Sequence, residues 1–345
     1  KTIWKIEGNS KLTPNDDVTL IWKNNQGLTF EKIIKIDNQY LFTIEQKIKN
    51  SSDKIYSFYP YAQIIRTKIP EIIDFFILHE GPLGVLDDQL IEKDYKDILD
   101  KKYSKNADNG FLGITDKYWL TSIIPQKNKK FRADFEYNEK FKVNYIETDS
   151  YDSKPNAQIS NIVNVVVAAK EVNVIDGYNE SLGLKKFDLV IDWGWFYWIV
   201  KPLFFLNDYF FKLAGNYGIA IILITVCLRL AFFPLNNYAF KSMSRMKLVQ
   251  PEMARLKEIH KDDKMKLQQA MMQLYKKEGI NPVSGCLPIL ISIPFFFAIY
   301  KMLFVTIEMR HQPFFGWIKD LSEKDPTSIF NLFGLIPWDP PSFMI

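Results

Sequence analysis

One apolar stretch limits what this chain of 345 residues can fold into. Residues 217–235 form a run of 19, close to the roughly 20 that an α-helix needs to cross the hydrocarbon core of a bilayer. Arg229 is the only charged residue in this run. A guanidinium inside hydrocarbon costs roughly 3 kcal/mol on insertion scales, so such a residue normally faces protein or water and marks a functional position. The alternative is that its long side chain reaches the interface and anchors the helix.

The chain changes character near Trp193. The residues before it have the composition of a soluble domain, and apolar and aromatic blocks dominate after it. A second membrane span is predicted at residues 286–307; membrane helices tolerate its two prolines, and Lys301 lies near one end, from which its side chain can reach the interface. Cys227 and Cys286 both fall in apolar stretches, so they indicate neither a disulfide framework nor a metal site.

A third apolar block, residues 193–213, is of a different kind. It carries ten aromatic side chains, but it is flanked or interrupted by Asp192, Lys201, Pro202, Asn207, Asp208 and Lys212. This pattern favours an amphipathic helix that lies in the membrane interface. If the block crossed the bilayer instead, the orientation of everything after it would be reversed.

The distribution of basic residues predicts the orientation. Residues 237–284 hold ten Lys or Arg against five acidic residues, whereas residues 308–345 hold only three basic residues. Because short cytoplasmic loops carry an excess of Lys and Arg, we expect residues 237–284 in the cytoplasm and both flanking regions outside. An amino-terminal domain that lies outside the cytoplasm requires a membrane span before it in the sequence. Since the chain starts at Lys1 without a signal-like apolar run, we expect it to be a fragment that has lost an amino-terminal segment.

The first 190 residues show short alternating runs separated by Asn, Asp, Gly and Lys clusters, which indicate strands and turns. Strands are predicted at residues 18–22, 29–36, 40–48, 131–137, 141–147 and 158–170, and a short helix at residues 95–105. The scarcity of helical periodicity predicts an all-β sandwich. This region has no Gly-rich phosphate loop, no metal-ligand cluster and one histidine, His79, which we expect to be an ordinary core or surface residue. It is therefore interpreted as a binding or scaffold domain.

A helical hairpin is predicted in the cytoplasmic segment. Its arms are residues 241–260 and 264–278, and the turn between them offers Asp262 or Asp263 as a helix cap. The hairpin is rich in methionine, at Met243, Met246, Met253, Met265, Met271 and Met272. Methionine suits apolar contacts with varied sequences, and the surrounding Lys and Arg suit anionic phospholipid headgroups or ribosomal RNA. The competing interpretation is that these methionines only pack the two helices together.

A polar stripe surrounds the charged residue of the first span. Arg229 and Asn236 follow Thr225 by four and eleven residues, so the three side chains share one face of a helix. Arg229 lies about 4.5 Å from the middle of the span toward the cytoplasmic side, at a rise of about 1.5 Å per residue. Ser292 and Tyr300 of the second span are candidates for the opposite wall of a hydrated cavity. Such a cavity attracts an anion, for example the acidic or polar tail of a polypeptide on its way into the membrane.

Several motifs in this order resemble the YidC family of membrane protein insertases. They are the Arg229 run of residues 218–235, Tyr238-Ala-Phe-Lys-Ser-Met-Ser-Arg-Met-Lys-Leu-Val-Gln-Pro251, Asp262-Asp-Lys264, Met271-Met-Gln-Leu-Tyr-Lys-Lys277 and Asn281-Pro-Val-Ser-Gly-Cys-Leu-Pro288. The resemblance covers roughly residues 190–328. Gly113-Ile-Thr-Asp-Lys-Tyr-Trp119 and the large first extracytoplasmic domain are similar to the Gram-negative branch, whose domain is a β-supersandwich.

The resemblance implies a multidomain, multi-pass protein of the inner membrane. The expected fold is an all-β periplasmic supersandwich followed by an α-helical membrane region with a cytoplasmic hairpin. The periplasmic β-sandwich is expected at residues 1–190 and an interfacial helix at residues 191–214. The membrane region is expected to consist of a transmembrane helix at 215–236, the cytoplasmic hairpin at 237–284, a second transmembrane helix at 285–307, and a periplasmic connection to the next transmembrane helix at 308–345. The remaining groove-forming helices of the family are expected outside this chain. The fragment alone is therefore not expected to be active.

The resemblance also implies an activity without catalysis. A hydrophilic groove, open to cytoplasm and lipid, receives nascent membrane proteins and releases their transmembrane segments into the bilayer, alone or with the Sec translocon, driven by burial of the client's apolar segment. Arg229 corresponds to the family's groove arginine, and Thr225, Asn236, Ser292 and Tyr300 are the other candidate groove residues. The ribosome and anionic phospholipids are further expected partners. No catalytic residue, cofactor, metal or small-molecule substrate is expected.

Three other classes compete with this interpretation. A channel or solute transporter would need a pathway to both sides and more polar wall positions than two spans offer. An intramembrane protease would need a Ser–His pair or paired Asp residues within the spans, and Ser292 has no such companion. A periplasmic binding scaffold anchored in the membrane remains an alternative.

Overall fold

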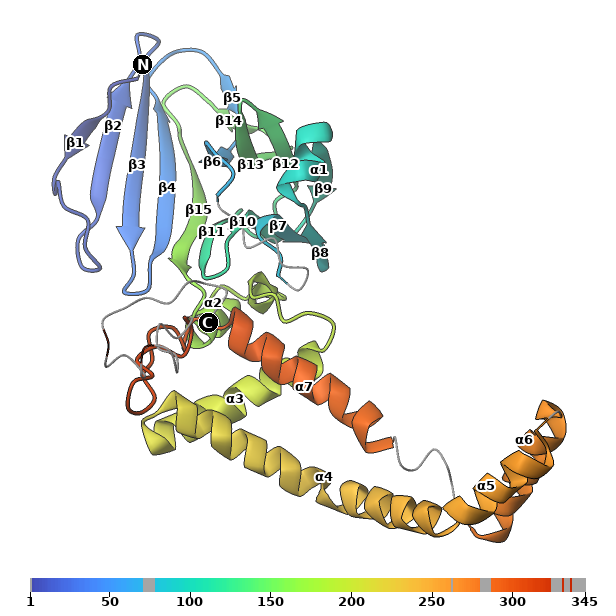
Figure 1. The fold of residues 1–345 in the computed structure, drawn as a ribbon. Helices are drawn as coiled ribbons and strands as arrows, with labels where there is room; N and C mark the ends of the chain where they lie inside the picture. The colour runs from blue at the N-terminus through green and yellow to red at the C-terminus, as the bar shows by residue number, and fades with distance from the viewer. Residues whose placement is uncertain are drawn as a thin grey trace. The chain divides into compact units, whose positions relative to one another are not determined.

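The computed structural model describes residues 2–70, 78–261, 263–279 and 287–323, together with Asn331 and Ile336. The chain forms two compact units. The first comprises Lys1–Asp192 and Val305–Glu308 and is built mainly from strands, and the second comprises Trp193–Phe304 and Met309–Ile345 and is helical (Figure 1). A β-sandwich followed by a helical region is therefore confirmed.

An antiparallel sheet, nine-stranded in the described part of the chain, dominates the first unit (Figure 1). Across the sheet its strands are β1 (Lys5–Glu7), β2 (Val18–Lys23), β3 (Leu28–Ile36), β4 (Leu41–Asn50), β15 (Gln158–Ala169), β11 (Trp119–Ile124), β10 (Gly110–Thr115), β7 (Gly81–Leu86) and β8 (Gln89–Glu92). The long strand β15 joins the two halves, because it pairs with β4 on one side and with β11 on the other. Residues more than a hundred positions apart, such as Ile44 and Val163, thereby become neighbours.

A smaller sheet forms the second layer of the sandwich. Within the described ranges it has four antiparallel strands, in the order β6 (Tyr61–Arg66), β13 (Lys140–Glu147), β12 (Phe131–Asn138) and β9 (Tyr103–Ala107). The helix α1 (Tyr95–Asp100) packs against β12, and β5 (Tyr56–Phe58) pairs with β14 (Tyr151–Ser153) beside the sandwich.

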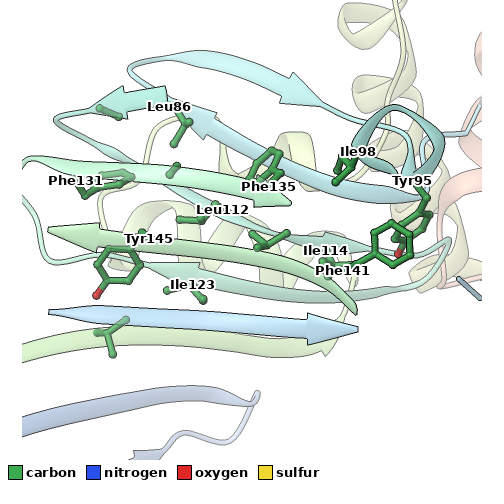
Figure 2. Close-up of a cluster of buried hydrophobic side chains, with 14 residues drawn as sticks. Leu86, Tyr95, Ile98, Leu112, Ile114, Ile123, Phe131, Phe135, Phe141 and Tyr145 are labelled. Atoms are coloured by element: carbon green, nitrogen blue, oxygen red, sulfur yellow. The ribbon is translucent and has the colours of Figure 1, made fainter. Parts of the chain in front are cut away.

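The hydrophobic core lies between the two sheets. Figure 2 shows Phe131, Phe135 and Tyr145 of the smaller sheet directed toward Leu112 and Ile123 of the larger one. Because side chains alternate between the two faces of a strand, the apolar residues at every second position reach the same core. Full burial of each large apolar side chain contributes roughly 1.5–3 kcal/mol, so this cluster holds the two layers together.

Helical segments cover the opposite face of the larger sheet. The ring of Phe111, next to Leu112 in β10 and on the other face, lies 4.8 Å from the ring of Phe187 in the 3₁₀-helix η1 (Phe187–Val190). The helix α2 (Val172–Ser181) is held by the Tyr178 hydroxyl, which donates to the Asp37 carboxylate at 2.9 Å. The prediction of an all-β domain therefore missed α2, a segment that contains Gly177 and in which Glu180 is the one strongly helix-favouring residue.

Six strands were predicted, and all six are confirmed with ends that differ by at most two residues. The predicted helix at residues 95–105 is too long, because it ends at Asp100 and Tyr103 already pairs with Phe135 in the sheet. The sequence interpretation missed the other nine strands of the described residues. Two of them, β7 and β10, have residues that are almost all buried and show no alternation. Glycine interrupts both strands because the neighbouring strand leaves no room: a Cβ at Gly113 would lie 2.3 Å from the Thr121 carbonyl oxygen.

The second unit contains the helices α3 (Tyr197–Ala214), α4 (Tyr217–Leu248), α5 (Gln250–Ile259), α6 (Lys264–Lys277) and α7 (Leu287–Val305). Gly215, at a φ of 65°, ends α3, and the Asn216 side chain caps α4 by accepting the Ile219 N–H at 3.1 Å. The helix α4 has 32 residues and a length of about 48 Å, at about 1.5 Å per residue. It is therefore longer than the roughly 30 Å thickness of the hydrocarbon core of a bilayer.

The predicted boundary between span and hairpin falls in the middle of α4, between residues 236 and 237. The break lies later, at Val249, just before Pro251 in the first turn of α5. The first arm of the hairpin is therefore continuous with the apolar helix rather than starting at residue 241, because nothing between residues 236 and 248 breaks the helical pattern. The predicted cap Asp262, Cys286, most of the 281–288 motif and most of the connection after residue 323 lie outside the described residues.

Candidate functional site

Two helices in the described part of the chain, α4 and α7, are long and apolar enough to cross a membrane. Only 17% and 28% of the residues in their most apolar windows are buried. Core helices of soluble proteins bury most of their surface, so the exposed apolar surface here is suited to lipid. The structure thus confirms two helices that are long and apolar enough to span a membrane.

An aromatic contact connects the two helices and fixes the direction of the polar stripe. The rings of Phe232 in α4 and Phe295 in α7 lie 5.0 Å apart in an edge-to-face arrangement. Phe232 follows Thr225 by seven residues and Arg229 by three, and it precedes Asn236 by four, so all four residues share one face. The predicted stripe on α4 is therefore directed toward α7.

On α7, the same contact separates the two predicted wall residues. Ser292 precedes Phe295 by three residues and lies half-buried on the same face. Tyr300 follows Phe295 by five residues, which places it about 140° around the helix at 3.6 residues per turn, and its ring stacks on Phe304 at 6.0 Å. The structure thus groups Ser292 with the stripe of α4, while the assignment of Tyr300 to this wall stays a prediction.

Arg229 is exposed, and no hydrogen bond or ion pair reaches it within the described ranges. Neither α4 nor α7 contains an acidic residue that would neutralise it. The Thr225 hydroxyl donates to the Ile221 carbonyl at 2.8 Å, so only its lone pairs are available to a ligand. Pro234 cannot donate to the carbonyl of Leu230, which leaves an acceptor beside the guanidinium. The face directed at α7 is therefore polar, positively charged and unsatisfied.

The side chain of Lys301 does not follow the prediction that it reaches out of the protein toward the membrane interface. It does not extend to the interface, because only 4% of its surface is exposed. Its Cε would lie 3.2 Å from a Cβ at Gly194, whose φ of 70° also favours glycine. The absence of a side chain at Gly194 makes room for the lysine stem within the second unit.

The hairpin methionines divide into two groups. Met246, Met253 and Met271 are half-buried, and the Tyr275 hydroxyl contacts the Met253 sulfur at 3.9 Å between α5 and α6. Met243, Met265 and Met272 are 41%, 74% and 52% exposed. Asp263 caps α6, since its carboxylate accepts the Lys266 N–H at 3.0 Å, and this hydrogen bond lowers the pKa of Asp263. Met253 therefore packs between the two helices, and the three exposed methionines are accessible for other contacts.

The helix α3 has one buried and one exposed face. Ile199, Leu203 and Phe204 are buried on the face that packs on α4. The exposed face carries large apolar side chains at helical spacing, which are Trp198, Phe205, Tyr209 and Leu213. This arrangement is the one expected of an interfacial helix, whose membrane position stays a prediction.

In the first unit, the 113–119 motif joins the two sheets. Asp116 forms a two-pronged ion pair with Arg66 of β6, at 2.5 and 2.7 Å, and this hydrogen bonding raises the pKa of Arg66. Thr115 accepts a hydrogen bond from the buried Lys170 at 2.9 Å. His79 is mostly buried and its backbone N–H donates to Asp192, in agreement with a structural role. The described residues contain no group of three His, Cys, Asp or Glu side chains suited to a metal ion.

Comparison with known proteins agrees with this architecture. A sequence profile described as YidC periplasmic domain matches residues 1–206, and one described as 60Kd inner membrane protein matches residues 209–338. A membrane protein insertase YidC of Pelagibacter ubique (strain HTCC1062) is 64% identical and covers 100% of this chain and 62% of its own length. A relative of the same name from Nitrobacter hamburgensis is 49% identical over 98% of this chain and 58% of its own length. Another, from Rickettsia prowazekii, is 46% identical over 100% of this chain and 62% of its own length.

The chain therefore spans about three fifths of the length of the curated relatives it matches. The resemblance noted from the motifs of the helical region is confirmed, and it extends to the β-sandwich. With both profiles matched in sequence order, this chain belongs to the YidC family.

Proposed function

We propose that the protein containing this chain inserts membrane proteins into the inner membrane of the cell. One observation carries the proposal: Arg229 is exposed on a polar face of α4 that is directed toward α7, without a partner in the described residues. A permanent structural role would supply a counter-charge. An exposed guanidinium without one is suited to a ligand that arrives and leaves.

The ligand class follows from the chemistry of this face. Arg229 offers five N–H donors and a permanent positive charge, and Thr225 and the Leu230 carbonyl offer acceptors. An acidic or polar polypeptide tail satisfies these groups, while the apolar segment that follows it contacts Phe232, Phe295 and lipid. The polar face holds the tail only briefly, and burial of the client's apolar segment in lipid drives its release.

The other parts of the chain have roles consistent with this proposal. The exposed Met265 and Met272 lie seven residues apart on one face of α6, close to Lys264, Lys266 and Lys276. Flexible apolar side chains among cations suit the apolar segments of varied nascent chains, and also ribosomal RNA and anionic phospholipids. We include the ribosome, these lipids and the Sec translocon among the proposed partners.

The test uses the full-length protein with photoreactive residues at positions 225, 236 and 292 during synthesis of a single-span client. We expect cross-links to the client from these positions and few from Leu230, which is 68% exposed. Arg229→Ala should weaken retention of an acidic tail by roughly tenfold or more, since hydrogen bonds to charged groups contribute about 1.5–3 kcal/mol. Arg229→Lys should retain part of this binding because the positive charge remains.

Arg245→Ala is the matched control, because Arg245 lies in the last turn of the same helix, sixteen residues after Arg229. It should leave cross-linking from position 236 unchanged. Efficient insertion by Arg229→Ala, combined with no cross-link from any of the three positions, would contradict the proposal. Ion conduction by the purified protein without a client would favour a channel instead.

A further inference from the structure

The start of α4 lies on the same helical face as the polar stripe. Gly218 precedes Thr225 by seven residues and Arg229 by eleven. At about 100° per residue, both side chains lie within about 20° of Gly218 around the helix axis. At a rise of about 1.5 Å per residue, Thr225 lies about 10.5 Å and Arg229 about 16.5 Å further along the helix. Gly218 therefore marks the amino-terminal end of the face that carries the polar stripe.

An aromatic side chain covers this end of the face. Gly218 is buried, and a Cβ built on it would overlap the ring of Phe314. Both residues belong to the second unit. The Asn216 amide donates to the carbonyls of Pro313 and Phe314 at 3.4 and 3.3 Å, which holds the backbone of the loop at the same place. The ring thus lies directly on the helix backbone, at a position where the face has no side chain of its own.

The loop that carries Phe314 is closed by its own hydrogen bonds. The Phe314 N–H donates to the Ile318 carbonyl at 3.0 Å, and Gly316, at a φ of 65°, allows the turn between them. Nearer the base of the loop, the Leu321 N–H donates to the Gln312 carbonyl at 3.0 Å. These hydrogen bonds fix the position of the ring against the helix.

We infer that Phe314 seals the polar face at the Gly218 end, so that water and small ions reach Arg229 from the other end of α4. The inference rests on the proposed function, because it requires the polar face to be hydrated. A ring in contact with the helix backbone leaves no room for water, and an apolar constriction stops ions because they cannot keep their hydration there. Phe314 is therefore a positioning residue, which decides from which side of the membrane the guanidinium is reached.

A seal at one end gives the site a direction. An acidic tail enters the polar face from the open end, which is the end of α4 that continues into α5, and it meets Arg229 before it reaches the ring. The same ring keeps the membrane closed to small anions, which the positive charge of Arg229 would otherwise attract into the protein. The receptive face and the permeability barrier are therefore separate parts of one helix surface.

The experiment uses the full-length protein with Cys227 and Cys286 replaced by alanine and with Thr225→Cys as a single reporter. A negatively charged thiol reagent that cannot cross the inner membrane is added to intact cells with a permeable outer membrane, on the side predicted for the first unit. We expect Phe314→Ala to raise the labelling rate at position 225 at least tenfold. Phe314→Leu, which keeps an apolar side chain over Gly218, should stay within threefold of the unsubstituted reporter.

Phe315→Ala is the matched control, because Phe315 is the neighbouring phenylalanine and is 60% exposed, whereas the ring of Phe314 lies on Gly218. It should leave the labelling rate unchanged. An equal rise in F314A and F315A overturns the inference, because general loosening of the loop then explains the labelling. Gly218→Ala is an independent second variant: its methyl group displaces the ring without removing it, and it should also raise the labelling rate.

Inverted membrane vesicles expose the opposite side of the membrane to the same reagent and report on the proposed function separately. Position 225 should be labelled there in every variant, because the open end of the polar face is unchanged. Labelling in vesicles, with no rise in intact cells for F314A and G218A, overturns the seal and leaves the proposed function intact. Absence of labelling in vesicles contradicts a hydrated polar face and with it both proposals.

Discussion

Several single side chains in the first unit connect segments that are distant in the sequence. Asp116 is the clearest, because its carboxylate binds both terminal nitrogens of Arg66, and one of these also donates to the Tyr95 hydroxyl at 2.8 Å. Both side chains of the ion pair are less than a third exposed, at 28% and 27%. Charge-assisted, two-pronged hydrogen bonds of this kind are stronger than exposed ion pairs. The 113–119 motif thus has a structural explanation.

Asp116→Asn should therefore destabilise the sandwich. The variant keeps the shape of the side chain but loses the charge and one acceptor, so we expect the free energy of unfolding to fall by about 1–3 kcal/mol. Urea unfolding followed by tryptophan fluorescence measures the change. Asp17→Asn is the control, because Asp17 is exposed and should change stability by less than about 0.5 kcal/mol. Equal stability of the two variants would show that the ion pair contributes nothing.

Asp320 organises the loop after α7 in a comparable way. Hydrogen bonds from the Ser322 hydroxyl and N–H, together with His311, hold the pKa of Asp320 at about 2. Its folded pKa is below its ordinary value of 3.8, so its stabilising effect is fully present above that value and is lost as the pH falls toward 2. We expect hydrogen exchange at the Ser322 and His311 amides, corrected for intrinsic pH dependence, to accelerate across this window. Asp320→Asn should exchange rapidly and without this pH dependence, and protection that persists in it would contradict the assignment.

Among the elements, α4 depends on close packing at its beginning. The Asn216 amide donates to the carbonyls of Pro313 and Phe314 at 3.4 and 3.3 Å, and a Cβ at Gly218 would lie only 2.1 Å from the Phe314 ring. The glycine therefore permits the loop of residues 309–323 to pack on the helix. Helix propensity alone would favour any residue other than proline over glycine at this position.

Gly218→Ala should loosen this loop despite the better helix propensity of alanine. We expect a lower midpoint of thermal unfolding and increased protease sensitivity of residues 309–323, because the new methyl group displaces the Phe314 ring. The double variant Gly218→Ala/Phe314→Ala should lose less stability than the sum of the losses of the two single variants, because the clash is then removed. Gly177→Ala is the matched control: it lies in α2 with no atom near its Cβ position, and it should stabilise by about 0.5–1 kcal/mol. A loss of stability at Gly177 equal to that at Gly218 would refute the packing argument.

For the molecule as a whole, the prediction concerns orientation. The excess of Lys and Arg in residues 237–284 predicts that the hairpin lies in the cytoplasm and the first unit on the other side of the membrane. Single cysteines at Met265 and Tyr59, with Cys227 and Cys286 replaced by alanine, test this in intact cells whose outer membrane is permeable to the reagent. A thiol reagent that cannot cross the inner membrane should label position 59 and not position 265, with both labelled after lysis. Labelling of position 265 in intact cells would reverse the topology.

The sequence by itself determined the features that depend on local pattern. Alternation along strands such as β4 and β15, the apolar lengths of α4 and α7, and the capping residue Asp263 are all set by residues close together in the chain. The polar stripe of α4 is also local, because Thr225, Arg229 and Asn236 share a face in any α-helix that contains them. The family motifs belong to the same category, since they are read in sequence order.

Only the tertiary structure decided which of these faces meet. The contact between Phe232 and Phe295 directs the stripe toward α7 and separates Ser292 from Tyr300, and no periodicity within either helix contains this information. The buried strands β7 and β10 escaped prediction because strands covered on both faces lose their alternation. The hydrogen bond from Asn161 of β15 to Glu147 of β13 likewise exists only in the folded domain. Whether a buried polar atom has a partner depends on neighbours that folding brings close, and these can lie far apart in the sequence.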